Sequence, residues 1–204
     1  MKTSAIIFDF GGVLLRTRDH SLRIKWEEKL GLKRWEFEDY IFNGPVGRKA
    51  QLGQTSWDEV WADAGEKFQL SAAETAQAQQ DFFGGDALDE DLAALIRQLK
   101  ARYTIGLLSN TWFSDGWAML RQFNIANAFH FTLTSAEVGV MKPDARIYQI
   151  ALERAGAAPS QTIFVDDSEQ NILAAHQLGM QTIHFVDPEA VYLRLAELRE
   201  FVAV

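Results

Sequence analysis

The chain has 204 residues, of which 48% are hydrophobic and 24% are charged, as in an ordinary globular protein rather than a disordered or fibrous one. Cysteine is absent, which excludes disulfides, zinc–thiolate sites, iron–sulfur clusters and thiol nucleophiles. The formal net charge of −8 argues against a nucleic acid or an anionic membrane as the main partner.

The first ten residues, MKTSAIIFDF, contain an apolar run only from Ala5 to Phe8, which is too short for the core of a signal peptide. No stretch of the sequence approaches the roughly 18 apolar residues that a membrane-spanning helix needs. We therefore expect a soluble, cytoplasmic protein. The sequence does not indicate its oligomeric state.

Short apolar runs without clear polar alternation are expected to form strands, at residues 5–10, 104–108, 129–134, 162–165 and 181–186. Strands of this kind are covered on both faces, as in a parallel sheet flanked by helices. Amphipathic helical patterns lie between and after them, at residues 89–100, 144–155, 168–178 and 189–201. This alternation predicts an α/β fold, a three-layer doubly wound parallel sheet.

One long segment departs from the alternation, because residues from about 18 to 83 contain helical patterns and no strand pattern. Ser56 with Glu59, and Ser71 with Glu74, have the spacing of a capping box, which marks the start of a helix. Four of the six tryptophans of the chain also lie in this segment. We expect a small helical domain with its own apolar core.

The expected domain organisation is an insertion. Residues 1–17 and 84–204 are predicted to form the α/β core, and residues 18–83 to form a helical cap. The turn at 44–47 is expected to divide the cap into two pairs of helices, and residues 83–86 to form the hinge that leads back to the core.

Polar side chains follow the predicted strands at their carboxyl ends, where ligands bind in open α/β sheets. They are Asp9, Ser109 with Asn110, Ser135, and Asp166 with Asp167. A carboxylate directly after a buried strand is costly to desolvate unless a cation pairs with it. Asp9, Asp166 and Asp167 would repel one another, so this pattern indicates a Mg²⁺ site with oxygen ligands.

Four short motifs occur in a fixed order: residues 6–13 (IIFDFGGV), 107–111 (LLSNT), 142–143 (KP) and 164–167 (FVDD). Each is weak alone, but the ordered set with the helical insertion resembles the haloacid dehalogenase-like hydrolase superfamily. The resemblance is greatest to the phosphatase branch that carries a helical cap after the first strand, and it covers essentially the whole chain.

The resemblance implies a role for each motif. Asp9 matches the nucleophile that attacks phosphorus and forms an aspartyl-phosphate. Ser109 matches the hydroxyl that binds the phosphoryl oxygens, with Asn110 as a further substrate contact, and Lys142 matches the cation that holds phosphoryl group and nucleophile together. Mg²⁺ is the implied cofactor, with Asp9, the backbone carbonyl of Gly11, Asp166 and Asp167 as its ligands.

The sequence departs from the family pattern at Gly11. Phosphatases of the superfamily usually carry a second aspartate there, which protonates the leaving oxygen and later activates water. A subset with glycine at this place includes sugar-phosphate phosphatases, so the resemblance implies a small phosphomonoester, and first of all a sugar phosphate, as the substrate. His20 is the nearest candidate for a substitute acid, and Arg48 in the cap is a candidate substrate contact.

Two alternatives remain open at this point. The dehalogenase branch also lacks the second aspartate, because a halide leaving group needs no proton. However, that branch needs no metal and does not keep a pair of carboxylates such as Asp166 and Asp167, which favours the phosphatase. The other alternative is a regulatory protein that binds metal and phosphate with little turnover.

Overall fold

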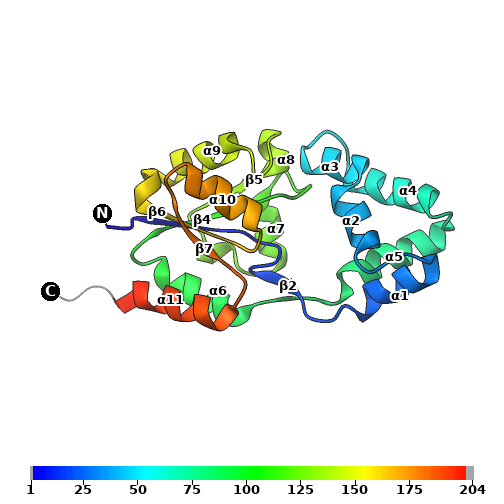
Figure 1. The fold of residues 1–204 in the computed structure, drawn as a ribbon, viewed down its shortest axis with the longest axis horizontal. Helices are drawn as coiled ribbons and strands as arrows, with labels where there is room; N and C mark the ends of the chain where they lie inside the picture. Colours follow the sequence, from blue (N-terminus) through cyan, green and yellow to red (C-terminus); the bar gives the residue numbers. More distant parts are fainter. Residues whose placement is uncertain (1, 201–204) are drawn as a thin grey trace.

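The structure, a computed structural model, describes residues 2–200, with side chains up to residue 198. Within this range a five-stranded parallel sheet has the strand order β5-β4-β1-β6-β7 (Figure 1). The strands are β1 (Ala5–Phe8), β4 (Thr104–Ser109), β5 (Phe131–Thr134), β6 (Thr162–Asp166) and β7 (Gln181–His184). The doubly wound α/β fold predicted from the sequence is confirmed.

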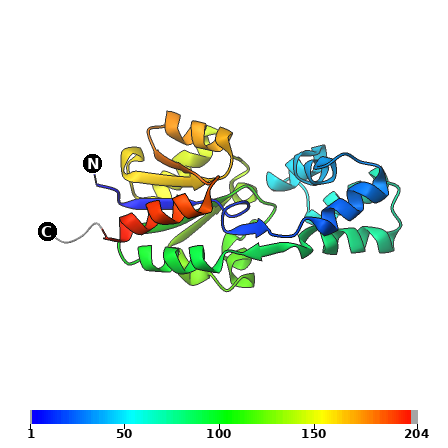
Figure 2. The same cartoon turned by 60° about the horizontal axis from the view of Figure 1, so that its bottom comes forward.

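Helices cover both faces of this sheet, so the core has three layers (Figure 2). One face packs on α6 (Glu90–Leu99), α7 (Gly116–Gln122) and α11 (Pro188–Glu200), and the other on α9 (Ala145–Ala155) and α10 (Glu169–Gln177). In β1, Ile6 and Phe8 join the first apolar cluster, whereas Ala5 and Ile7 join the second. Burial on both faces explains why the strands lack polar alternation.

Several boundaries differ from the sequence-based prediction. The strand expected at 5–10 ends at Phe8, because the next residues turn and the Phe10 carbonyl accepts hydrogen bonds from the N–H groups of Leu14 and Leu15. The strand expected at 129–134 begins at Phe131, after a 3-10 turn at Ala126–Ala128. The strand expected at 181–186 ends at His184. The last residue of the helix expected at 189–201 lies outside the described residues.

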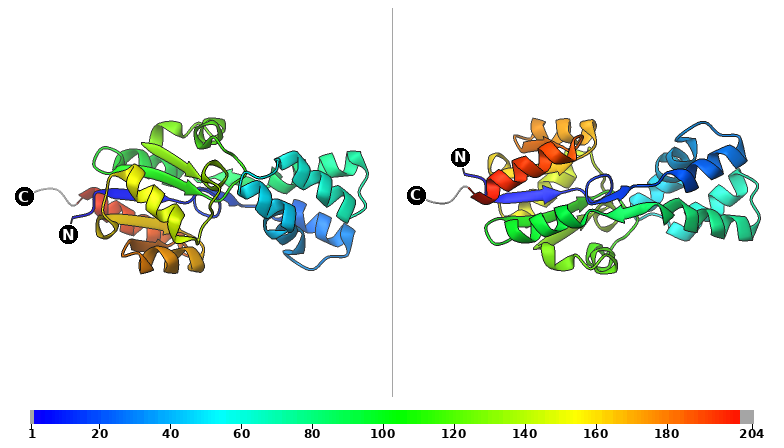
Figure 3. Two further views of the ribbon diagram at one scale, coloured as in Figure 1. Left: turned by 90° about the horizontal axis from the view of Figure 1, so that it is seen from above. Right: turned by 90° about the horizontal axis from the view of Figure 1, so that it is seen from below.

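A separate helical lobe contains α1 (Ser21–Leu30), α2 (Glu36–Asn43), α3 (Pro45–Gln51), α4 (Trp57–Lys67) and α5 (Ala72–Gly84) (Figure 3). Its own apolar cluster includes Trp26, Phe37, Trp61 and Phe82. Both predicted capping boxes are present, at the starts of α4 and α5.

The expected turn at residues 44–47, with two helix pairs around it, is wrong. A new helix, α3, begins at Pro45, so the lobe between residues 18 and 85 has five helices. Proline is favoured at the first position of a helix, since its φ is preset and its missing N–H would have no partner there. The Gly-Pro pair therefore separates two helices directly.

A two-stranded ribbon joins the two lobes. It consists of β2 (Leu15–Thr17) and β3 (Asp86–Leu88), which run antiparallel with Thr17 opposite Asp86. Each strand of the ribbon has only three residues, none of them buried, which is too few for a recognisable strand pattern. The sequence therefore did not indicate this ribbon. The chain thus enters and leaves the helical lobe at one place.

The remaining elements are short. Helix α8 (Ser135–Val138) follows β5, and a second 3-10 turn, Pro159–Gln161, precedes β6. No helix within residues 2–200 has the length and apolar character that crossing a bilayer requires.

Candidate active site

The side chain of Lys142 lies between two predicted site residues at the carboxyl ends of β1 and β6. Its Nζ is 2.7 Å from Asp9 Oδ1 and 2.7 Å from Asp166 Oδ2, and it also donates to the Leu108 carbonyl at 3.2 Å. Lys142 is 3% exposed, so this ammonium is held in the protein interior. Although burial acts to lower it, the two carboxylates raise the pKa of Lys142, which therefore stays charged.

Asp166 is fully buried and is held by three further hydrogen bonds. The Ser168 N–H donates to Oδ1 at 2.8 Å, and the Asn171 amide donates to Oδ1 at 3.0 Å and to Oδ2 at 3.2 Å. The bond from Ser168 means that Asp166 also satisfies a backbone donor at the start of α10. Sequence analysis missed Asn171, and an amide on the first turns of the helix after a metal-ligand motif is the signal that could have identified it.

The three predicted metal ligands meet in space. One carboxylate oxygen each from Asp9, Asp166 and Asp167 lies within 4.8 Å of the others. Three carboxylates beside the single ammonium of Lys142 leave a formal charge of −2, which a divalent cation would neutralise. Desolvation and the charges of Asp166 and Asp167 outweigh Lys142 and raise the pKa of Asp9 to about 8. These residues therefore fit a Mg²⁺ ion, which prefers carboxylate and carbonyl oxygen.

The loop after β1 brings two glycines to this cluster. Gly12 has a φ of 77°, and a Cβ there would lie 2.0 Å from Asp167 Oδ2. Gly11 has ordinary φ, and nothing lies within 4 Å of the Cβ position. A side chain at position 11 would thus extend into open space.

Ser109 and Asn110 lie at the end of β4, the strand next to β1. The Asn110 side chain makes two bonds to the backbone of Lys142: it accepts from the N–H at 2.8 Å and donates to the carbonyl at 3.0 Å. Asn110 therefore holds the segment that carries Lys142. Ser135, which also follows a strand, is fully buried and exchanges hydrogen bonds with the backbone of Thr111, which gives it a structural role.

A cavity of about 860 Å³ opens between the two lobes beside these groups. Gly11, Gly12, Ser109, Asn110 and Asp167 line it from the core. The helical lobe contributes Arg23, Glu38, Phe42, Trp57 and Phe83 to its lining. A ligand that fills this cavity would contact the cluster around Asp167 and the helical lobe at the same time.

The two residues that sequence analysis suggested near the cap have different positions. His20 lines the cavity, and its Nδ1 is buried without a hydrogen-bond partner among residues 2–198. Arg48 is exposed on α3 and does not line the cavity, so the structure does not bring it to the site.

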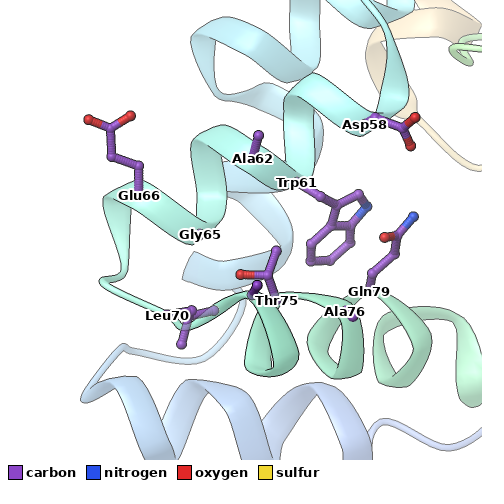
Figure 4. A pocket seen from close by; sticks show the side chains of 10 residues that line it. Asp58, Trp61, Ala62, Gly65, Glu66, Leu70, Thr75, Ala76 and Gln79 are labelled. Atoms are coloured by element: carbon purple, nitrogen blue, oxygen red, sulfur yellow. The ribbon is translucent and has the colours of Figure 1, made fainter.

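A smaller hollow of about 400 Å³ lies within the helical lobe, between α4 and α5 (Figure 4). None of the predicted site residues lines it. Its charged side chains are Asp58 and Glu66, with no cation among the described residues that form it, so an anionic ester would be repelled. The cavity between the lobes is therefore the candidate active site.

Comparisons with known proteins identify the family of this chain. A family model of haloacid dehalogenase-like hydrolases matches residues 3–179. The D-ribitol-5-phosphate phosphatase of Bacteroides thetaiotaomicron is 30% identical over 188 residues, which cover 87% of this chain and 89% of that protein. The sesquiterpene phosphatase of Aspergillus oryzae is 27% identical over 198 residues, which cover 95% of each chain.

Solved structures show the same fold. A haloacid dehalogenase family enzyme from Bacteroides thetaiotaomicron, in complex with magnesium and inorganic phosphate, matches with a TM-score of 0.73 and 24% identity, covering 93% of this chain and 99% of that one. A 2-haloacid dehalogenase from Pseudomonas syringae pv. tomato matches with a TM-score of 0.59 and 23% identity, covering 90% and 86%. The fold and the family match together identify the class of protein. This chain belongs to the haloacid dehalogenase-like hydrolase family.

Proposed function

We propose that this protein is a Mg²⁺-dependent phosphatase that hydrolyses a small phosphomonoester through an aspartyl-phosphate on Asp9. The observation that carries the proposal is the contact of one lysine with two carboxylates at the ends of neighbouring strands, beside the cavity. The phosphatases among the relatives that match nearly the whole chain support the same chemistry.

In the first step the Asp9 carboxylate attacks phosphorus, the bond from phosphorus to the alcohol oxygen breaks, and the alcohol leaves with a proton. Lys142 and the Phe10 N–H both bond Oδ1 of Asp9, which leaves Oδ2 available for the attack. Lys142 orients the nucleophile, and the Ser109 hydroxyl donates to a phosphoryl oxygen. These contributions, positioning and charge stabilisation, are the ones that phosphoryl transfer requires.

In the second step water attacks the phosphorus of the aspartyl-phosphate, which releases inorganic phosphate and regenerates the Asp9 carboxylate. Gly11 can supply no base for this water and no acid for the leaving alcohol. His20, with its unpartnered Nδ1 at the cavity, is the residue we assign to proton transfer.

Asp9, Asp166, Asp167 and the Gly11 carbonyl would hold the metal. When bound, Mg²⁺ supplies positive charge that stabilises the phosphoryl oxygens and keeps the carboxylates ionised. The protein holds Asp166 in place through Asn171 and Ser168, so this ligand is preorganised.

We further propose that residues 18–83 act as a cap on a core of residues 1–17 and 84–204. The helical lobe contributes to the cavity wall, so it would exclude water from the bound ester and select the alcohol. Asn110 is proposed to hold the segment that carries Lys142 and, as a residue that lines the cavity, to contact the substrate. Arg48 has no place in this proposal.

The test is phosphate release from p-nitrophenyl phosphate with and without Mg²⁺. Activity should require the metal and disappear in Asp9→Asn and Lys142→Ala, and circular dichroism checks that both variants are folded. Acid quenching during turnover should trap a protein 80 Da heavier than the free chain, the mass of one phosphoryl group, and Asp9→Asn should not give it. Full activity in excess EDTA would contradict the proposal.

The two alternative functions, a dehalogenase and a regulatory protein, predict different experimental results. Halide release from a 2-haloacid without metal would favour the dehalogenase. Binding of Mg²⁺ and phosphate without turnover of any phosphomonoester would favour a regulatory protein.

A further inference from the structure

The cavity has an aromatic wall that the proposed chemistry does not use. It consists of Phe42, Trp57 and Phe83 from the helical lobe and Trp112 and Phe113 from the segment after β4. All five are partly buried, so part of each side chain remains accessible. This aromatic wall lies in the same cavity as Ser109 and Asp167.

The rings of the aromatic wall are ordered around Trp112. Trp57 stacks on Trp112 with ring centroids 3.6 Å apart and planes 11° apart. Phe42 lies 6.0 Å from Trp112 at 20°, and Phe83 lies 5.9 Å away at 56°. Three helices of one lobe thus direct aromatic rings at a single residue of the other, which gives a continuous apolar surface.

Many of the polar side chains in the cavity already have partners within the protein. Arg23 donates to the Phe82 carbonyl at 2.7 Å, to Glu38 at 2.6 Å and to Asp86 at 2.9 Å. Thr17 donates to Asp86 at 2.6 Å. A polyol could bond to the unpartnered atoms His20 Nδ1 and Arg16 Nε, but many of its other hydroxyl groups would have to break existing hydrogen bonds or remain unpaired against aromatic rings, and both are costly.

The size of the cavity also favours a bulky apolar group over a short polar alcohol. Small-molecule sites typically have volumes of about 300–1,000 Å³, and the observed 860 Å³ lies near the upper end. A phosphate ester with a short polar alcohol would leave most of the aromatic wall in contact with water. An apolar group of eight or more carbon atoms would cover it and gain the free energy of that burial.

We propose that the substrate is the phosphate monoester of a bulky apolar alcohol, whose hydrocarbon part packs on the aromatic wall, rather than the sugar phosphate expected from sequence. The proposal rests on the phosphatase function above. It assigns the choice of substrate to Phe42, Trp57 and Trp112, which contact the alcohol and take no part in the chemistry at phosphorus.

A series of n-alkyl phosphates tests this directly. Ethyl, butyl, hexyl and octyl phosphate have leaving groups of nearly equal basicity, so differences in rate report contacts with the chain rather than proton transfer. Each fully buried methylene can add about fourfold to kcat/KM. We expect octyl phosphate to exceed butyl phosphate by at least about tenfold and to exceed a hexitol monophosphate by more, all below the micelle concentration.

Matched variants connect the effect to the wall. Phe42→Leu and Trp112→Leu should lower the ratio of kcat/KM on octyl phosphate to kcat/KM on ethyl phosphate, which flattens the dependence on chain length. Phe68→Leu is the control, because Phe68 packs on Phe37 and Tyr40 in the same lobe and does not line the cavity. It should keep the full dependence, and melting temperatures establish that all three variants are folded.

The outcomes separate this proposal from the function on which it rests. If alkyl phosphates are hydrolysed at equal rates, or the hexitol phosphate is preferred, the substrate class is wrong although the phosphatase stands. If no phosphomonoester is hydrolysed, n-alkylphosphonates in Mg²⁺ buffer test the cavity by calorimetry. Affinity that rises with chain length and falls in Trp112→Leu then supports the apolar site, and affinity independent of chain length overturns it.

Discussion

Gly12 lies so close to Asp167 that a Cβ on Gly12 would be 2.0 Å from the Oδ2 atom of Asp167. The φ of 77° at Gly12 adds a second constraint, since residues with a Cβ rarely adopt it. The preceding Gly11 has neither constraint. The packing of Asp167, a proposed metal ligand, therefore requires glycine at position 12 but not at position 11.

Gly12→Ala is expected to destabilise the protein by more than about 1 kcal/mol and to weaken Mg²⁺ binding, because the new methyl group displaces Asp167. Gly11→Ala is the matched control and should change stability by less than about 0.5 kcal/mol. Thermal unfolding and Mg²⁺ calorimetry measure the two effects. Equal losses in both variants would contradict the assignment.

Asp9→Asn is expected to abolish hydrolysis and yet raise the melting temperature of the metal-free protein. The substitution removes one of three crowded carboxylates, whose repulsion and burial already raise the pKa of Asp9. We expect a gain of the order of 1 kcal/mol, measured by thermal unfolding in EDTA. Saturating Mg²⁺ should stabilise the wild type more than the variant. A less stable metal-free variant would show that the ion pair with Lys142 outweighs the repulsion.

Asn171→Ala is expected to weaken Mg²⁺ binding by about 10- to 100-fold without removing a ligand, since the amide holds both oxygens of Asp166. Activity should return at high Mg²⁺ concentration, which a catalytic group would not allow. The measurement is the Mg²⁺ dependence of kcat. Gln77→Ala, which removes a similar amide contact to Asp81 in the helical lobe, is the control and should leave that dependence unchanged.

Much of the fold and of the proposed cluster of carboxylates could be predicted, because strong local sequence signals mark the strand ends and the helix starts. A buried apolar run followed by a carboxylate marks Asp9 and Asp166, and the parallel sheet then brings these residues together. The capping boxes likewise depend on residues three positions apart, so Ser56 and Ser71 mark helix starts correctly.

The features that were missed depend on contacts between distant segments. The aromatic wall joins Phe42 and Trp57 to Trp112 across the two lobes, and no periodicity in the sequence reports that contact. Helix α3 was read as a turn, because Pro45 stops a preceding helix and starts a new one equally well. Arg48 was predicted as a substrate contact from its charge and its place near the expected turn in the cap, and it does not line the cavity.

The missing acid at Gly11 predicts a rate that depends on the leaving group. General acid–base catalysis contributes about 10²- to 10⁴-fold, so an alkyl phosphate should react slowly relative to p-nitrophenyl phosphate once the proton from His20 is lost. His20→Ala should lower the rate on hexyl phosphate much more than on p-nitrophenyl phosphate, measured as kcat/KM. Loss of equal size on both esters would indicate that His20 has only a structural role.

Gly11→Asp is the complementary experiment. The absence of neighbours around the Cβ position and the ordinary φ mean that an aspartate can be accommodated there. Turnover of hexyl phosphate should rise, and p-nitrophenyl phosphate should gain much less. An unchanged ratio of the two rates would mean that the new acid does not reach the leaving oxygen.

The acid stability of the helical lobe should depend on Glu74. Hydrogen bonds from Lys29 and from Ser71 lower the pKa of Glu74 to about 2, compared with 4.5 ordinarily. A lowered pKa in the folded state stabilises the protein above pH 4.5, and this stabilisation is lost as the pH falls through about 2. Glu74→Gln should therefore lower the melting temperature at pH 6 and change it little at pH 2.5. A constant difference at both pH values would contradict this.

The ribbon of β2 and β3 also has a consequence for how the chain folds. The central strand β1 pairs with β4, and the whole helical lobe lies between these two strands in the sequence. Their pairing therefore closes a long loop. Once Thr17 pairs with Asp86, the helical lobe no longer contributes to the loop between β1 and β4, and the effective length of this loop becomes several times shorter. This reduces the entropic cost of closure by about 1 kcal/mol. The helical lobe, which would otherwise delay sheet formation, can thus form first and bring the two halves of the sheet together.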